Sequence, residues 1–139
     1  MSAEARIRQY VETFNRRDAA GCAALFATDA VLHDPFFPEP IRGRGGLEAL
    51  NASIWRAFPD IQWRLRSVID GGDRVAFDLA VSGVNDGPLE MPDGELPATG
   101  RAISFETGVF WTVGPDGLIT EERSYFDATG VAAQLGLTS

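Results

Sequence analysis

Few side chains in this sequence can carry out chemistry, and their types limit the reactions that are open to it. All twelve basic residues are arginine, so catalysis through a lysine Schiff base is excluded. The chain has one histidine, His33, and one cysteine, Cys22, which are too few for a Cys/His metal cluster or an internal disulfide. The sequence therefore predicts a protein with no resident metal or cofactor.

Asp34 is a candidate for acid/base chemistry. It precedes Pro35, and the nearby residues Leu32, Phe36 and Phe37 are apolar. If these neighbours line a pocket, they raise the pKa of the Asp34 carboxyl group towards the range of a useful general base. The same Asp-Pro pair is also typical of a turn in which the aspartate caps local backbone amides. The sequence leaves both interpretations open.

The spacing of apolar residues predicts helices first and strands afterwards. Apolar residues recur at helical spacing in the first part of the chain and alternate with polar ones in later segments. The predicted helices are 3–17, Ala19–Ala27, Gly45–Phe58 and Thr129–Leu135, and the predicted strands are Ala30–His33, Ile61–Ile69, Arg74–Val81, Ala102–Val113 and Leu118–Phe126. The long connection Gly83–Gly100 is predicted to be a functional flap or a poorly ordered loop. This order indicates an α+β fold with helices on one face of a bent sheet.

Several stretches resemble known families. Residues 25–36 (LFATDAVLHDPF) and 39–44 (EPIRGR) resemble the corresponding part of ketosteroid isomerases. Residues 116–123 (DGLITEER), with Tyr125–Asp127 and Gln134–Gly136, resemble SnoaL-like polyketide cyclases. Both families have the nuclear transport factor 2-like fold. The resemblance implies a single domain over residues 1–139, a cone whose curved, mostly antiparallel sheet wraps around three N-terminal helices and a deep apolar pocket.

The resemblance to ketosteroid isomerases implies two catalytic residues. The general base of that family falls on Asp34, and the phenolic donor to the oxyanion falls on Tyr10. Together they imply a cofactor-free enzyme that transfers a proton through an enolate on an apolar, carbonyl-bearing small molecule. A tyrosine on the apolar face of a helix is also typical of a packed core aromatic, and this interpretation of Tyr10 stays open.

Other catalytic positions of the two families are not filled in this sequence. The second acid of the isomerases falls on the segment Gly108–Trp111, which contains no acidic residue. The catalytic acid of the cyclases falls on Ser124, and their histidine falls near Val109 or Phe110. The alternatives are therefore a SnoaL-like aldol cyclase that relies on Asp34, or a non-catalytic module for ligand binding or dimerisation.

Further residues are predicted to line the pocket, and structural roles are open for some of them. The predicted lining is Phe36, Phe37, Trp55, Phe110, Ser124 and Asp127. Asp127 lies where the last strand meets the last helix, a position at which aspartate commonly caps a helix. His33 is expected to point away from Asp34, because successive side chains of a strand face opposite sides. Asp78 is interpreted either as a pocket acid or as a rim residue at a dimer contact.

Charge and hydropathy indicate which partners to expect. A net charge of −8 opposes binding to a nucleic-acid backbone. No apolar run approaches the roughly 18 residues of a membrane span, and the lone cysteine fits a reducing compartment, so we expect a cytoplasmic protein that does not bind membranes. The expected partner is a small apolar molecule, and the resemblance implies a homodimer.

Overall fold

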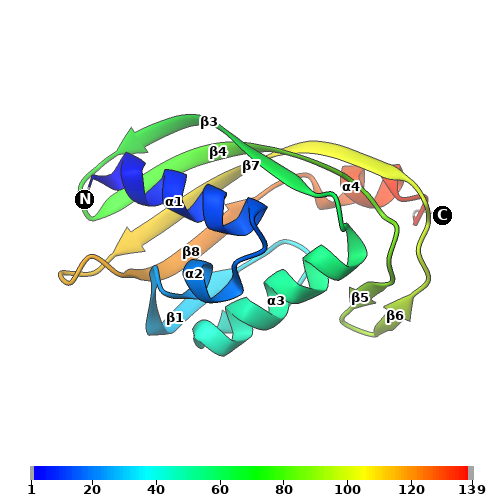
Figure 1. Ribbon diagram of the computed structural model, residues 1–139, viewed down its shortest axis with the longest axis horizontal. Coiled ribbons are helices and arrows are strands. Elements are labelled where there is room, and N and C mark those ends of the chain that lie inside the picture. Colours follow the sequence, from blue (N-terminus) through cyan, green and yellow to red (C-terminus); the bar gives the residue numbers. More distant parts are fainter. Residues whose placement is uncertain (1, 138–139) are drawn as a thin grey trace.

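The computed structural model describes residues 2–137 and has an α+β architecture, which confirms the predicted class. The helices are α1 (Ala3–Asn15), α2 (Ala19–Ala23), α3 (Gly43–Ala57) and α4 (Ala128–Gln134), and the strands are β1 (Phe26–His33), β2 (Ile41–Arg42), β3 (Gln62–Asp70), β4 (Arg74–Val84), β5 (Leu89–Met91), β6 (Gly94–Leu96), β7 (Ala102–Val113) and β8 (Ile119–Tyr125). A six-stranded sheet has the order β2-β1-β8-β7-β4-β3. Its long strands arch over α1 and α3 (Figure 1). No helix within residues 2–137 is long and apolar enough to cross a membrane.

The helix α1 carries Tyr10 into the core. Its first turn is capped by Ser2, whose side chain accepts a hydrogen bond from the N–H of Ala5 (3.1 Å). One face of the helix is buried, because apolar residues recur three or four positions apart along it. The apolar residues of this face are Ile7, Tyr10, Val11 and Phe14.

The sheet separates an inner face, which packs against the helices, from an outer face. Strand β4 follows the predicted alternation, since Val75, Phe77, Leu79 and Val81 are buried. Asp78 lies on the outer face, where it accepts a hydrogen bond from the Ser67 hydroxyl and lies 3.8 Å from the Arg66 guanidinium. The interpretation of Asp78 as a pocket acid is therefore wrong.

The second predicted helix is too long, because the strand after it begins earlier than expected. Helix α2 ends at Ala23, and β1 begins at Phe26 rather than at Ala30. Phe26 pairs with Ile119 of β8, and its fully buried ring contacts Tyr10 and Trp111 at centroid distances of 5.5 and 6.1 Å. Pairing and burial thus outweigh the helical preference of the alanine-rich sequence.

The connection predicted to be a flap or a poorly ordered loop contains the hairpin β5–β6 and is fastened to α3. The fully buried Asn85 amide donates to the carbonyl oxygens of Ala57 (3.0 Å) and Gly87 (2.9 Å). Its Oδ1 accepts from the backbone N–H of Thr99 (2.7 Å), which ties the two ends of the connection together. A side chain at Gly87 would collide with the backbone of α3, since its Cβ would lie 1.9 Å from the Arg56 carbonyl oxygen.

Candidate active site

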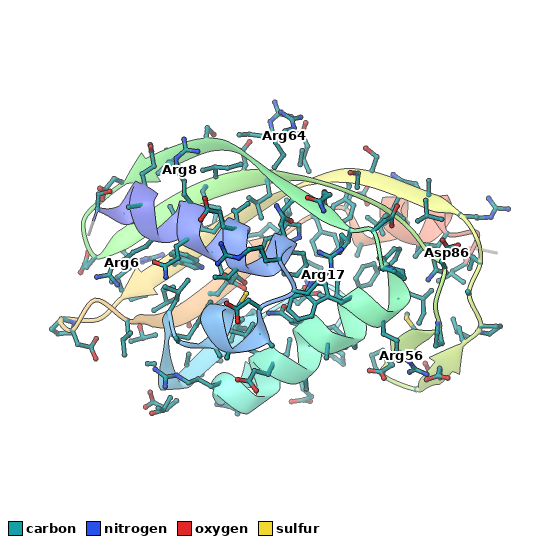
Figure 2. All side chains as sticks on the ribbon, in the orientation of Figure 1. Arg6, Arg8, Arg17, Arg56, Arg64 and Asp86 are labelled. Atoms are coloured by element: carbon teal, nitrogen blue, oxygen red, sulfur yellow. The ribbon has the colours of Figure 1, made fainter. Side chains whose placement is uncertain are left out.

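A cavity of about 350 Å³ lies between the inner face of the sheet and the helices. Most of its lining is apolar and comes from α3, β4, β7 and the β5–β6 hairpin. Arg56 of α3 points towards this hairpin (Figure 2) and pairs with Glu90 (3.3 Å) and Glu95 (2.9 Å). These ion pairs join the exposed side of α3 to the hairpin that forms part of the cavity wall.

Tyr10 lines the cavity from α1 and is only 3% exposed. Its ring packs against Phe26, Trp63 and Trp111 at centroid distances of 5.5, 5.2 and 5.3 Å. Burial raises the pKa of the Tyr10 hydroxyl well above its ordinary value, and the nearby charge of Glu122 adds to this effect. Tyr10 is therefore neutral at physiological pH and can donate a hydrogen bond into the cavity.

Asp34 follows the end of β1 and lines the same cavity. Its Oδ1 accepts a hydrogen bond from the backbone N–H of Phe36 (2.9 Å), which is the turn-capping role left open by the sequence. Among the described residues, Oδ2 has no hydrogen-bond partner. Burial raises the pKa of Asp34, and the Phe36 amide offsets part of that rise. One oxygen of the carboxyl group can thus cap the turn while the other contacts a ligand bound in the cavity.

A second carboxyl group, Glu122 of β8, lines the cavity and is 7% exposed. The indole N–H of Trp111 donates a hydrogen bond to its Oε1 (2.8 Å). Burial raises the pKa of Glu122 to about 7; hydrogen bonds from Trp111 and Tyr10 oppose this rise, and the charge of Asp34 adds to it. Besides Glu90, which pairs with Arg56, the cavity therefore has two carboxyl groups that influence each other, together with one phenol.

Three of the other predicted lining residues face the cavity, namely Phe36, Phe37 and Ser124. The remaining three lie elsewhere. Phe110 is 44% exposed on the outer face, because alternation along β7 turns it away from its buried neighbour Val109. Asp127 caps α4 by accepting from the N–H of Gly130 (2.9 Å). Trp55 packs against Phe14 at a centroid distance of 5.4 Å.

His33 lies outside the cavity lining, as expected from its position next to Asp34. Its Nε2 is 3.7 Å from the Glu121 carboxylate on β8. Glu121 also interacts with the Arg123 guanidinium (3.3 Å). These groups belong to a polar cluster on the outer face of the sheet.

Asn51 of α3 is a further polar group at the cavity, and it is 2% exposed. Its side-chain nitrogen has no hydrogen-bond partner among the described residues. A buried donor without a partner costs about 1–3 kcal/mol. An acceptor atom on a bound molecule would remove this cost, so Asn51 provides a free hydrogen-bond donor in a largely apolar wall.

Comparison with known proteins agrees with this geometry. The sequence matches the model of the SnoaL-like domain over residues 7–122. The chain belongs to the SnoaL-like domain family. This confirms the resemblance inferred from the sequence. Among curated proteins, none matches the chain significantly.

Solved structures similar to this SnoaL-like domain cover nearly the whole chain. IdmH from Streptomyces antibioticus, proposed to be a polyketide cyclase, is 28% identical with a TM-score of 0.75, covering 96% of this chain and 97% of IdmH. A proposed polyketide cyclase from Xanthomonas campestris pv. campestris is 26% identical with a TM-score of 0.80, covering 96% of each chain. A protein of ketosteroid isomerase-like fold from Catenulispora acidiphila, solved in complex with trimethylamine, is 17% identical with a TM-score of 0.79, covering 99% and 96%. The last comparison supports the fold alone.

Two cavity residues of this SnoaL-like domain, Glu122 and Asn51, had no predicted role. Glu122 lies two positions before Ser124 on one strand, so alternation counted back from Ser124 places both side chains on the inner face. Asn51 follows Leu47 by four residues in α3, which places the two on one face of the helix. The periodicity of each element therefore contained a signal for both residues.

Proposed function

We propose that the protein is a cofactor-free general acid/base enzyme that acts on an apolar, carbonyl-bearing small molecule such as a steroid-like or polyketide ring system. The observation that carries this proposal is that Asp34 and Tyr10, from different elements, line one apolar cavity. A volume of about 350 Å³ falls within the range of small-molecule sites. The unpaired Asn51 amide supports a guest that carries a second hydrogen-bond acceptor.

The reaction begins with removal of a proton from the carbon next to the substrate carbonyl. The Asp34 carboxylate accepts this proton, and the electron pair of the broken C–H bond forms a carbon–carbon double bond. The carbonyl π electrons move to the oxygen, which becomes the enolate oxygen. The neutral Tyr10 hydroxyl stabilises this oxygen by a hydrogen bond that strengthens as negative charge develops.

The second half of the reaction decides the product. In an isomerase, the substrate carries a carbon–carbon double bond next to the deprotonated carbon, so the intermediate is a dienolate. Protonated Asp34 returns its proton to the far carbon of this dienolate, the carbon–carbon double bond moves next to the carbonyl, and the carbonyl is restored. The raised pKa of Asp34 suits this double role, because a group that must accept and return a proton works best with a pKa near the operating pH. The apolar wall excludes water from the reacting atoms and strengthens both interactions.

Aldol cyclisation is the second candidate, and the similarity to two proposed polyketide cyclases favours it. The enolate carbon would attack a second carbonyl of the same substrate, and the new alkoxide would receive a proton. Because Ser124 cannot act as an acid at neutral pH, Asp34 would have to be the base in this reaction as well. Isomerisation and cyclisation share the same first step.

The first step can be tested by exchange of deuterium from the solvent into the carbon next to the carbonyl. We expect the wild-type protein to catalyse exchange into a 3-oxo-Δ5 steroid or a polyketide methyl ester, and Asp34→Asn to abolish it. Product analysis separates a shifted double bond from a new ring. Exchange that persists in Asp34→Asn would remove Asp34 from the mechanism. Binding of these compounds without exchange would favour a non-catalytic ligand-binding module.

A further inference from the structure

Glu122 is a carboxyl group that the proposed reaction does not yet use, although it lies in the same cavity. Its side chain points inward from β8, directly beside Trp111 of the neighbouring strand β7 in the sheet register. The Trp111 indole N–H fixes one carboxyl oxygen at 2.8 Å. Within residues 2–137, no Arg or His forms an ion pair with this carboxyl group.

The groups that face Glu122 from the surrounding elements give it no positive charge. They are Tyr10 of α1, Cys22 of α2 and Asp34 after β1. If both carboxyl groups were ionised, two negative charges would share an apolar cavity, which is unfavourable. Each carboxyl group receives hydrogen bonds that stabilise its charged form, from the Phe36 amide at Asp34 and from Trp111 and Tyr10 at Glu122, so these bonds do not separate the two. Glu122 is the more buried of the two, and burial favours the proton of the pair on Glu122.

We propose that Glu122 is a further catalytic residue, a protonated carboxyl group that donates a hydrogen bond to the enolate oxygen beside the Tyr10 hydroxyl. This inference rests on the proposed function. A carboxylic acid kept neutral in an apolar site can act in this way as an oxyanion donor. Strand β7 lacks an acid at Gly108–Trp111, and β8 supplies one from the adjacent strand. Trp111 is then a positioning residue that orients the acid.

The proposal predicts a particular pH dependence of the exchange rate. Asp34 must be ionised and Glu122 must be protonated, so the wild-type rate should fall as the pH rises through about 7. In Glu122→Gln the amide donates at every pH, and this alkaline fall should disappear. Glu121→Gln, one residue away on the outer face, should keep it. An alkaline fall that persists unchanged in Glu122→Gln would overturn the proposal.

A second measurement tests the proton on Glu122 without any substrate. If the pKa of Glu122 is higher in the folded state than in the unfolded chain, then at a pH between these two pKa values the folded protein holds the proton more tightly than the unfolded chain does. The free energy of unfolding of the wild-type protein should therefore decrease as the pH rises from about 4.5 to about 7. This decrease should be smaller in Glu122→Gln and retained in Glu121→Gln. Urea denaturation at a series of pH values measures it.

The two measurements distinguish failure of this inference from failure of the proposed function. Catalysed exchange combined with parallel stability profiles of wild type and Glu122→Gln would overturn the role of Glu122 alone. A difference in stability without exchange of any substrate would overturn the proposed function and the catalytic role of Glu122 together. Exchange with an alkaline fall that is lost only in Glu122→Gln would support both.

Discussion

Two adjacent glutamates of β8 show how the two faces of the sheet give one residue type different chemistry. Glu121 points to the outer face, where Arg123 and His33 lie 3.3 and 3.7 Å away. Glu122 points to the inner face, where it meets an indole N–H and a largely apolar cavity. The outer carboxylate has the Arg123 guanidinium as a partner that stabilises its charge, whereas burial favours the protonated form of the inner carboxyl group.

The same contrast applies to the other groups of the candidate site. Asp34 lines the cavity, and Asp78 lies on the outer face with Ser67 and Arg66. Tyr10 is buried, whereas Tyr125, the other tyrosine of the chain, is 56% exposed on the outer face. Each group with a proposed catalytic role therefore has an outer-face counterpart of the same type, which serves as a matched control.

The largest effect is expected when the base is removed. Asp34→Asn keeps an oxygen that can accept the Phe36 amide hydrogen bond but cannot take up a proton. The exchange rate should fall by about 10²–10⁴-fold, the usual contribution of general base catalysis. Asp78→Asn should exchange at the wild-type rate. Equal losses in the two variants, measured by deuterium incorporation, would contradict the distinction between the two faces.

Removal of the phenolic hydroxyl should have the next largest effect. Tyr10→Phe keeps the ring contacts with Phe26, Trp63 and Trp111 but loses the hydrogen bond to the enolate oxygen. The rate should fall by about 10²-fold, the lower end for loss of one oxyanion donor, because Glu122 remains. Tyr125→Phe is the control and should exchange normally. A Tyr10→Phe variant as fast as wild type would assign Tyr10 to the core alone.

A smaller and more specific effect is expected from the residue that orients Glu122. The Trp111 indole N–H stabilises the ionised form of Glu122, so its loss in Trp111→Phe should raise the pKa of that carboxyl group. The alkaline fall of the exchange rate should then move to higher pH. Trp63→Phe removes another cavity indole and should leave the fall in place. A shift to lower pH in Trp111→Phe would contradict the assignment.

The smallest effects are expected from a substitution of Asn51. It should stabilise the protein without a ligand and weaken the binding of a ligand. Asn51→Leu removes a buried donor that has no partner, so the free protein should become more stable by about 1 kcal/mol in urea denaturation. Binding of a 3-oxo-Δ5 steroid should weaken by about tenfold. Ser53→Ala is the control, because that cavity hydroxyl already donates to the Leu50 carbonyl (2.9 Å). A less stable Asn51→Leu variant that binds normally would show that the amide has no role in ligand binding.

Much of the fold could be predicted from local sequence signals. The strand Ala102–Val113 has the predicted bounds, and the second helix begins at Ala19 as expected. The start of β1 could not be predicted in this way, because Phe26 joins the sheet only through its pairing with Ile119. The order in Gly83–Gly100 depends on long-range hydrogen bonds of Asn85, which local composition does not reveal.

The candidate site could be predicted in part, and the omission of Glu122 has a structural cause. Asp34 and Tyr10 came from the resemblance to ketosteroid isomerases, and both line the cavity. Alternation counted forward from the buried Ile119 would place Glu121 on the inner face. An irregularity in the pairing of β7 and β8 shifts the register between Ile119 and Glu121, so that Glu122 faces inward instead. The sequence therefore gives conflicting signals: alternation counted back from Ser124 places Glu122 on the inner face, whereas alternation counted forward from Ile119 does not, and only the structure shows the bulge that reconciles them.

The contrast between the two glutamates can be measured directly by following the side-chain carboxyl carbons in a ¹³C NMR titration. Spectra of wild type, Glu121→Gln and Glu122→Gln between about pH 4 and pH 9 would assign the two signals. We predict that the Glu122 carbon titrates with a midpoint near 7. A midpoint near the ordinary value of 4.5 would show that Glu122 is ionised at neutral pH and would contradict its role as an acid.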